Sequence, residues 1–371
     1  MINTNAKIRI QGKLYSQGEL HKYCNDKLDN SKLEEWERDI FSFILVWFSE
    51  SDTIAVQTSG STSDPKIIHL QKKHMIASAK ATLSFFKLKE NDSIWLCLPV
   101  GYIAGKMMIV RAIVGNLNLI YSKPESSPTT YQNKNVDFAA MVPNQVFEML
   151  ASKKGILELQ KINTLLIGGS SIPTNMEIRL LQNGMNNVWH SYGMTETITH
   201  IALRRIKKES KFNFYKLLNN VSIKINSESQ LIIDAPSLGV KNLLTNDIAE
   251  LSNDGSFSII GRKDNVIISG GVKLFPELIE GKIDKLLSND FFIGNIPDEK
   301  LGNKVVLFIE TGTDKCDNID LAKLNSDMKI HLKKYELPRK IVCLSKFLRT
   351  ETNKLQRISM ISKYVTDMHK Y

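Results

Sequence analysis

Short apolar runs alternate with longer amphipathic stretches between about residue 53 and residue 200. The runs are typical of buried strands, and the stretches carry apolar residues at helical spacing. Strands are predicted at 53–56, 66–70, 93–98, 117–121, 138–142, 164–167 and 187–190, and helices at 72–86, 101–114, 145–153 and from Pro173 onward. This alternation predicts an α/β fold with a mostly parallel sheet. Ligands of such sheets bind at the carboxyl ends of strands, so the loops after 56, 167 and 190 are expected to line one crevice.

The segment before this alternation is less regular. Residues 1–30 predict one or two short strands followed by a polar helix or loop. Ser31 and Glu34 have the spacing of a capping box. The helix that they open carries an apolar stripe that is expected to pack on a core: Leu33, Trp36, Ile40, Phe43, Trp47 and Phe48.

The pattern changes after residue 220. Short β runs at 221–225, 231–234, 249–251 and 257–260 predict a β subdomain, and the polar segment 261–265 then interrupts the chain. The remaining residues predict a small α+β unit, with strands at 266–268, 291–293 and 305–310 and helices at 276–287 and 320–332. We therefore expect a large N-terminal domain, 1–263, and a small, mobile C-terminal domain, 264–371.

Composition limits the class of protein. The 371 residues are 42% hydrophobic and 24% charged, as in soluble globular proteins that hold a core and a cleft. The net charge of +10 is spread along the chain, without zinc-finger spacing or a basic stripe interleaved with aromatic residues, so nucleic acid is not an expected partner. The longest apolar run, 41–48, is too short to span a bilayer, and the first residues lack a signal core. A cytoplasmic protein without membrane insertion is expected.

The cysteines are far apart in the sequence, at Cys24, Cys97, Cys316 and Cys343. Because no C-x-x-C pair occurs, neither a zinc site nor a thioredoxin-like motif is predicted. Free thiols are the simplest expectation for a cytosolic chain. Cys97 and Cys343 are expected to be buried and not nucleophilic, and His190 is expected to be structural.

The stretch 58–66, with the sequence Thr-Ser-Gly-Ser-Thr-Ser-Asp-Pro-Lys, lies between two predicted strands. Its hydroxyl and N–H groups can surround phosphate oxygens, and Lys66 can neutralise them. The alternative interpretation is a Ser/Thr-rich hairpin turn. A P-loop is excluded because Pro65 precedes the lysine and Ile67 follows it, leading into a strand. This disfavours a kinase or a GTPase.

Five segments resemble, in order, motifs of the adenylate-forming superfamily of acyl-CoA synthetases, adenylation domains and luciferases. Segment 58–66 is similar to the phosphate loop, 192–196 (Tyr-Gly-Met-Thr-Glu) to Y-G-x-T-E, 245–247 (Thr-Asn-Asp) to T-G-D, 261–280 to the hinge segment and 349–354 to the catalytic-lysine motif. The chain departs from the family where glycine is usual, at Ser63, Asn246 and Asn353. Asparagine tolerates left-handed backbone, so Ser63 is the larger departure.

The resemblance implies a site for ATP. The β- and γ-phosphates would be held by Thr58, Ser59, Gly60, Ser61, Thr62 and Lys66. The adenine and the turn around it would involve Gly169, Ser170, Ser191, Tyr192 and Gly193. Asp247 would accept from the ribose hydroxyls, with Arg262 nearby, and Glu196 would carry Mg²⁺.

The resemblance also implies the chemistry. A carboxylate would attack the α-phosphorus of ATP, with Thr195 on the α-phosphate and Lys354 as the mobile cation that stabilises the developing charge. Asp264 matches the hinge position. Gly270 and Gly271 would then face the pantetheine arm of coenzyme A, whose thiol forms the thioester. Taken singly, each charged residue of this set could instead be a solvated surface residue.

Segments 99–108, 191–204 and 264–271, together with the short region before the phosphate loop, resemble the compact o-succinylbenzoate–CoA ligases of menaquinone biosynthesis. The resemblance implies a small carboxylic acid as substrate, and Tyr102, Lys106 and His200 are candidates to contact it. A CoA ligase for another aryl or fatty acid remains an alternative, as does a stand-alone adenylation module that loads a carrier protein. The oligomeric state is left open.

Overall fold

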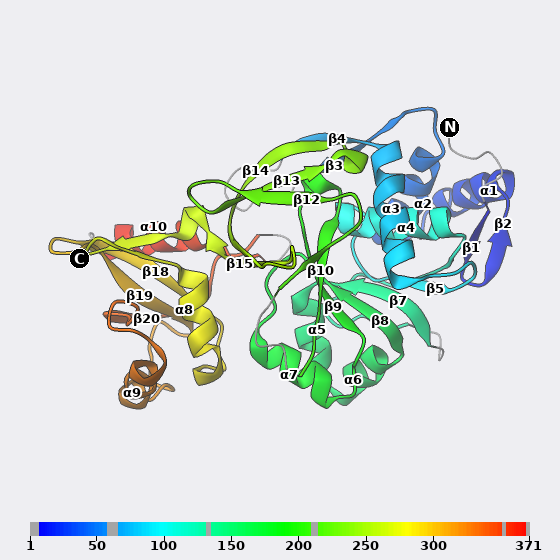
Figure 1. Ribbon diagram of the computed structural model, residues 1–371. Coiled ribbons are helices and arrows are strands. Elements are labelled where there is room, and N and C mark those ends of the chain that lie inside the picture. The colour runs from blue at the N-terminus through cyan, green and yellow to red at the C-terminus, as the bar shows by residue number, and fades with distance from the viewer. Residues whose placement is uncertain (1–6, 58–65, 131–134, 209–213, 351–353, 369–371) are drawn as a thin grey trace.

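The computed structural model describes residues 7–57, 66–130, 135–208, 214–350 and 354–368, and a long sheet with helices on both faces dominates it (Figure 1). Within these ranges, nine strands form the sheet in the order β11-β10-β9-β8-β7-β5-β6-β1-β2. Their bounds are β1 Ile8–Ile10, β2 Lys13–Tyr15, β5 Ser93–Leu96, β6 Asn118–Tyr121, β7 Val136–Met141, β8 Ile162–Ile167, β9 Val188–Gly193, β10 His200–Arg205 and β11 Lys216–Leu217. Strands β9-β8-β7-β5-β6-β1 pair in parallel, and the strands at both edges are antiparallel. The predicted α/β fold with a mostly parallel sheet is confirmed.

Side chains of the central strands alternate between two cores, as parallel strands covered on both faces require. Ile94 and Leu96 of β5 join one core, whereas Trp95 and the adjacent Cys97 join the other. The first core is covered by α1 Gln17–Leu28, α2 Glu35–Trp47, α3 Lys72–Phe86 and α4 Ile103–Gly115. The second is covered by α5 Pro143–Leu150, α6 Lys153–Gln160 and α7 Thr174–Gln182. The helices predicted from apolar spacing therefore lie on the sheet as expected.

Two further sheets complete the larger part of the molecule. A hairpin pairs β3 Thr53–Gln57 with β4 Ile67–Gln71, and a four-stranded antiparallel sheet contains β12 Ser222–Ile225, β13 Gln230–Ala235, β14 Val240–Leu251 and β15 Phe257–Arg262. Leu231, Ile233 and Phe257 of the second sheet join the first core. The predicted β subdomain is confirmed, although β14 begins well before the predicted 249–251 because polar residues interrupt its apolar pattern.

The chain after Arg262 forms a smaller α+β part beside the larger one (Figure 1). It begins with η3 Lys263–Asn265 and continues with β16 Ile267–Ser269, β17 Val272–Leu274, α8 Pro276–Ile283, η4 Asp284–Leu286, β18 Phe291–Asp298, β19 Gly302–Glu310, α9 Leu321–His331, β20 Lys340–Leu344 and α10 Arg357–Met368. Strands β18, β19 and β20 form one sheet with cores of its own on both faces. Strand β20 and helix α10 were not predicted.

One hydrogen bond joins the two parts at the start of α7. The N-cap residue, Pro173, makes no side-chain cap bond. Instead, Thr174 N donates to Asp284 Oδ2 of η4 at 2.8 Å. A carboxylate at this position satisfies a free backbone donor and interacts favourably with the helix dipole. A residue of the smaller part thus caps a helix of the larger part.

The predicted capping box at Ser31 and Glu34 is wrong. Helix α2 begins at Glu35, and its N-cap residue Glu34 makes no side-chain cap bond. Residues 30–33 instead form a turn, in which Leu33 N donates to the Asn30 carbonyl. The chain does contain a Ser–Glu pair at a helix start: Ser16 N donates to Glu19 Oε2 at 2.9 Å, at the start of α1. The predicted turn at Tyr192 also lies within a strand, because β9 continues to Gly193.

The expectation of free thiols throughout is wrong for Cys316 and Cys343, which form a disulfide with a Cα–Cα distance of 5.5 Å. Cys343 lies on β20, and the loop after β19 returns along that strand to bring Cys316 to it. A separation of 27 residues gives no sign of this proximity in the sequence. Cys24 and Cys97 are free thiols, as expected, and both are buried. No helix in the described ranges has the length and apolar content needed to cross a bilayer.

Candidate active site

The carboxyl ends of β8 and β9 lie side by side and bring two predicted segments together. Strand β8 ends at Ile167, and the Gly168–Gly169–Ser170 turn follows. Ser191 Oγ of β9 donates to the Ile167 carbonyl at 3.2 Å. A Cβ on Gly168 would lie 2.2 Å from this Oγ, so a larger residue there would displace the Ser191 hydroxyl. The two predicted adenine-site segments therefore share one edge of the sheet.

The segment after β9 is held by a threonine hydroxyl. The 3₁₀ turn η1 spans Thr195–Thr197, and Thr197 Oγ1 accepts from Met194 N at 3.0 Å and donates to the Thr199 carbonyl at 2.8 Å. Glu196 is exposed on this turn. Within the described ranges, no three His, Cys, Asp or Glu side chains gather as a metal cage. The single exposed carboxylate of Glu196 fits Mg²⁺, which commonly takes one or two carboxylates and completes its shell with phosphate and water.

A chain of polar contacts links the main sheet to the β subdomain. Tyr192 Oη donates to Asp247 Oδ2 at 2.6 Å, and Arg262 Nη1 donates to Asp247 Oδ1 at 3.1 Å. Arg262 Nη2 also donates to Asp264 Oδ2 at 3.0 Å. Burial, together with the nearby charge of Asp247, raises the pKa of the Tyr192 phenol, so Tyr192 stays a donor. These four predicted site residues are therefore joined in space by hydrogen bonds.

Lys354 lies close enough to this chain of contacts to interact with it electrostatically. Burial lowers the pKa of the Lys354 ammonium, the charge of Arg262 lowers it further, and Asp247 opposes both. The segment that carries Lys354 is anchored on the smaller part, where Arg349 Nη2 pairs with Glu310 Oε2 at 2.6 Å. A lysine from the end of the chain thus lies within electrostatic range of Asp247 and Arg262.

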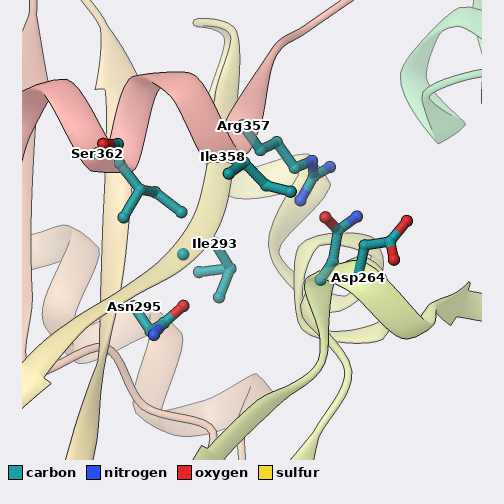
Figure 2. A pocket seen from close by; sticks show the side chains of 9 residues that line it. Asp264, Ile293, Asn295, Arg357, Ile358 and Ser362 are labelled. Atoms are coloured by element: carbon teal, nitrogen blue, oxygen red, sulfur yellow. The ribbon is translucent and has the colours of Figure 1, made fainter. Parts of the chain in front are cut away.

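A cavity of about 320 Å³ lies beside the predicted hinge (Figure 2). Asp264 and Asn265 form one side, and residues of β18 and of the first turns of α10, including Arg357, form the other. Asn265 Nδ2 donates to Glu277 Oε1 of α8 at 2.6 Å. The hinge segment is therefore tied to the smaller part next to open space.

Arg111 is a functional candidate that the sequence analysis missed. It is 2% exposed on α4, and its nearest hydrogen-bond acceptors are neutral: Thr82 Oγ1 at 3.3 Å, Thr199 Oγ1 at 3.4 Å and Met108 Sδ at 3.5 Å. Burial alone lowers the pKa of its guanidinium to about 10, and no carboxylate of the described residues counteracts this. An arginine within the apolar stretch 103–114 was the sequence signal for it. A buried cation with only neutral acceptors is suited to bind an anion.

Of the three predicted substrate contacts, His200 shares a hydroxyl partner with this cation. His200 Nε2 is 3.2 Å from Thr82 Oγ1, the hydroxyl that also accepts from Arg111. Burial and the charge of Arg111 lower the pKa of His200 well below its usual value, so the ring is neutral. Lys106 instead donates to the Val100 and Gly101 carbonyls, at 2.5 and 3.2 Å. That geometry favours a structural role for Lys106.

The remaining candidates lie on turns and element ends. Tyr102 is the N-cap residue of α4 and is half-buried. Gly270 and Gly271 have positive φ in the tight turn between β16 and β17. Lys66 is exposed just before β4. Residues 58–65 of the predicted phosphate loop lie outside the described residues.

Sheet order, strand-end turns and the Tyr192–Asp247–Arg262 contacts together define an adenylate-forming fold. Residues 11–233, more than half of the chain, match the family described as AMP-binding enzyme, and the chain belongs to that family.

Individual relatives agree with this family. A 2-succinylbenzoate–CoA ligase of Listeria monocytogenes is 25% identical over 355 residues, which cover 88% of this chain and 73% of that protein. An acyl-CoA synthetase (AMP-forming)/AMP-acid ligase II-like protein of Dyadobacter fermentans is 29% identical, with a TM-score of 0.60 over 92% of this chain and 98% of that chain. The o-succinylbenzoate–CoA synthetase of Bacillus subtilis, solved with its acyl-adenylate intermediate, has a TM-score of 0.71 at 21% identity, over 82% of this chain and 68% of that chain. The same enzyme has been solved with ATP and a magnesium ion.

Proposed function

We propose that the chain is an ATP-dependent o-succinylbenzoate–CoA ligase of the cytoplasm, where ATP and coenzyme A are both available. In the first half-reaction, a carboxylate oxygen of the acid attacks the α-phosphorus of ATP and pyrophosphate leaves, giving the acyl-adenylate. In the second, the thiol of coenzyme A loses its proton and attacks the acyl carbon, and AMP leaves with the thioester formed. Both transition states concentrate negative charge, so positioned cations and hydrogen-bond donors supply the catalysis.

The site residues take the roles that the family resemblance implies. Lys354 would neutralise the charge that develops between the carboxylate and the α-phosphate. Asp247 would accept from the ribose hydroxyls, and its hydrogen bonds with Tyr192 and Arg262 support this role by fixing the carboxylate. Glu196 would hold Mg²⁺, which when bound neutralises phosphate charge. The proximity of Lys354 to Asp247 and Arg262 supports an arrangement suited to adenylation.

The burial of Arg111 without a carboxylate partner among the described residues is the observation that supports the proposed class of substrate. Its guanidinium is buried, and its three acceptors are neutral. They are Thr82 on α3, Met108 on α4 and Thr199 just after the Thr195–Thr197 turn. A second carboxylate of the acid would supply the missing countercharge through a bidentate hydrogen bond. His200, beside it, would complete the anion site as a neutral neighbour. A dicarboxylate is therefore favoured over a fatty acid or a simple benzoate.

The two-domain division stays part of this proposal. We place the hinge at Asp264, with 1–263 as the substrate-binding domain and 264–371 as a lid that carries Lys354. After adenylation the lid would turn, Lys354 would leave, and Gly270 and Gly271 would face the pantetheine arm. The cavity beside Asp264 gives this segment room to move, which supports a rotation there.

A panel of acids tests the proposal. AMP release that depends on coenzyme A is expected with o-succinylbenzoate and not with benzoate or palmitate. Equal rates across the panel would refute the substrate. Release of AMP onto a carrier protein, but not onto free coenzyme A, would instead identify an adenylation module.

A further inference from the structure

A buried polar network lies directly behind the Gly168–Ser170 turn. His190 Nε2 is 3.0 Å from the Ser170 carbonyl, and His190 Nδ1 is 2.9 Å from Tyr215 Oη and 3.3 Å from Arg204 Nη2. Arg204 in turn pairs with Glu177 of α7, with its Nη2 at 2.5 Å from Oε1. His190, Arg204 and Tyr215 are 5–7% exposed, so water does not substitute for these contacts.

The partners of His190 permit only one form of its ring. A guanidinium can only donate, so Nδ1 must accept from Arg204. A carbonyl can only accept, so Nε2 must carry the proton and donate it to Ser170. Burial, reinforced by the charge of Arg204, lowers the pKa of His190 to about 3, and the bond to Ser170 only partly opposes this. The imidazole is therefore neutral, with a fixed tautomer, at any working pH.

The network holds the turn at Ser170 and through the helix that follows it. His190 binds the carbonyl of Ser170, and the Arg204–Glu177 pair binds the first turn of α7, which follows the turn in sequence. Tyr215 also packs against Tyr192, with ring centroids 5.8 Å apart, and Tyr192 binds Asp247. One set of buried contacts thus reaches both the base side and the ribose side of the candidate nucleotide site.

We propose that His190 is a positioning residue that fixes the Ser170 turn for recognition of the adenine base of ATP. The inference rests on the proposed function, because the adenine site follows from it. His190 touches neither nucleotide nor acid; it acts through the Ser170 carbonyl. Loss of its donor would leave that carbonyl without a partner and release the turn, which would weaken adenine binding without altering the acid site at Arg111.

Two substitutions separate positioning from packing. His190→Gln keeps one amide donor for Ser170 and one amide acceptor for Arg204 and Tyr215, as the neutral ring does. His190→Leu keeps the volume of the side chain but removes both the donor to Ser170 and the acceptor for Arg204 and Tyr215. His331→Leu, at an exposed histidine of α9, is the matched control. We expect His190→Leu to raise KM for ATP at least tenfold, which corresponds to about 1.4 kcal/mol, and to reduce discrimination between ATP and GTP. KM for the acid should not change, and His190→Gln should retain most of the wild-type affinity.

Affinity for a fluorescent ATP analogue, measured without acid, makes the test independent of the substrate assignment. An enzyme that binds ATP but does not use o-succinylbenzoate would refute the proposed function and leave this inference intact. If His190→Leu does not fold, Tyr215→Phe removes one donor to Nδ1 and should raise KM for ATP by a smaller factor. Unchanged nucleotide affinity in folded His190→Leu would overturn the inference, as would equal losses for His190→Leu and His190→Gln.

Discussion

Replacing Arg111 with methionine should stabilise the fold while impairing recognition of the acid. Burial lowers the pKa of the guanidinium from its ordinary value to about 10. Because this pKa lies below that of the unfolded chain, the charge destabilises the folded state at every pH below about 10, and the penalty disappears as the pH rises toward the ordinary pKa of arginine. At neutral pH the cost is about 3 kcal/mol. Methionine removes the charge and keeps apolar volume, so we expect the free energy of unfolding to rise by about 1–3 kcal/mol.

The same substitution should weaken catalysis with a dicarboxylate. A hydrogen bond between charged groups contributes about 1.5–3 kcal/mol, so loss of a bidentate pair should cost about 3 kcal/mol in transition-state binding. That corresponds to a fall in kcat/KM of roughly 150-fold. The kcat/KM of Arg111→Lys should lie between the values of the wild type and Arg111→Met, because lysine keeps the charge but not the planar pair of donors.

Steady-state AMP release and thermal unfolding measure the two effects. The two acids are o-succinylbenzoate and the analogue that lacks its unreactive carboxylate. Arg111→Met should reduce kcat/KM for the dicarboxylate far more than for this slower analogue. Equal losses for both acids would refute the assignment of Arg111 to substrate, and a lowered thermal midpoint would refute the electrostatic argument.

Three further predictions concern the smaller part of the molecule. Lys354→Ala should abolish pyrophosphate exchange but leave thioester formation from supplied acyl-adenylate largely intact; surviving exchange would exclude the lysine from adenylation. Because the protonated amine is the active form and its pKa is lowered, wild-type exchange should decline at a lower pH than the ordinary lysine value of about 10.4, and Lys354→Arg should remove that decline. Breaking the disulfide by Cys316→Ser with Cys343→Ser should lower the stability of this part by about 3.5 kcal/mol on chain entropy alone, measured by urea unfolding with and without reductant. Identical midpoints for the variant and the wild type under oxidising conditions would contradict a bond there.

Local patterns predicted elements well where apolar spacing was regular. The helix Lys72–Phe86 has the predicted bounds, because apolar residues recur on one side and Lys87 ends the helix in a left-handed conformation. Strand β14 was predicted only at its end, since its first half is largely exposed and lacks an apolar pattern. Helix α2 was found, but its start was placed too early because a turn residue, Asn30, competed with the serine cap.

The site was predicted where it is encoded in contiguous segments and missed where it depends on distant contacts. Tyr192, Asp247 and Arg262 were recognised from separate motifs, and the fold brings them into contact. Among the described residues, Arg111 has no carboxylate partner because α3 and the segment after η1 place neutral hydroxyl groups around it. The spacing of residues along the chain does not predict these contacts. The Cys316–Cys343 pair depends in the same way on the alignment of a loop with β20.

If the smaller part turns as proposed, the bond between Thr174 and Asp284 makes the start of α7 a reporter of its position. Since Pro173 offers no cap of its own, the Thr174 amide has its carboxylate partner only while η4 is docked. If the lid turns during the reaction cycle, this amide should exchange its hydrogen with solvent in step with that rotation. A single backbone position in the larger domain, followed by hydrogen exchange or by its NMR shift, would then time the passage between the two half-reactions without a label on either domain.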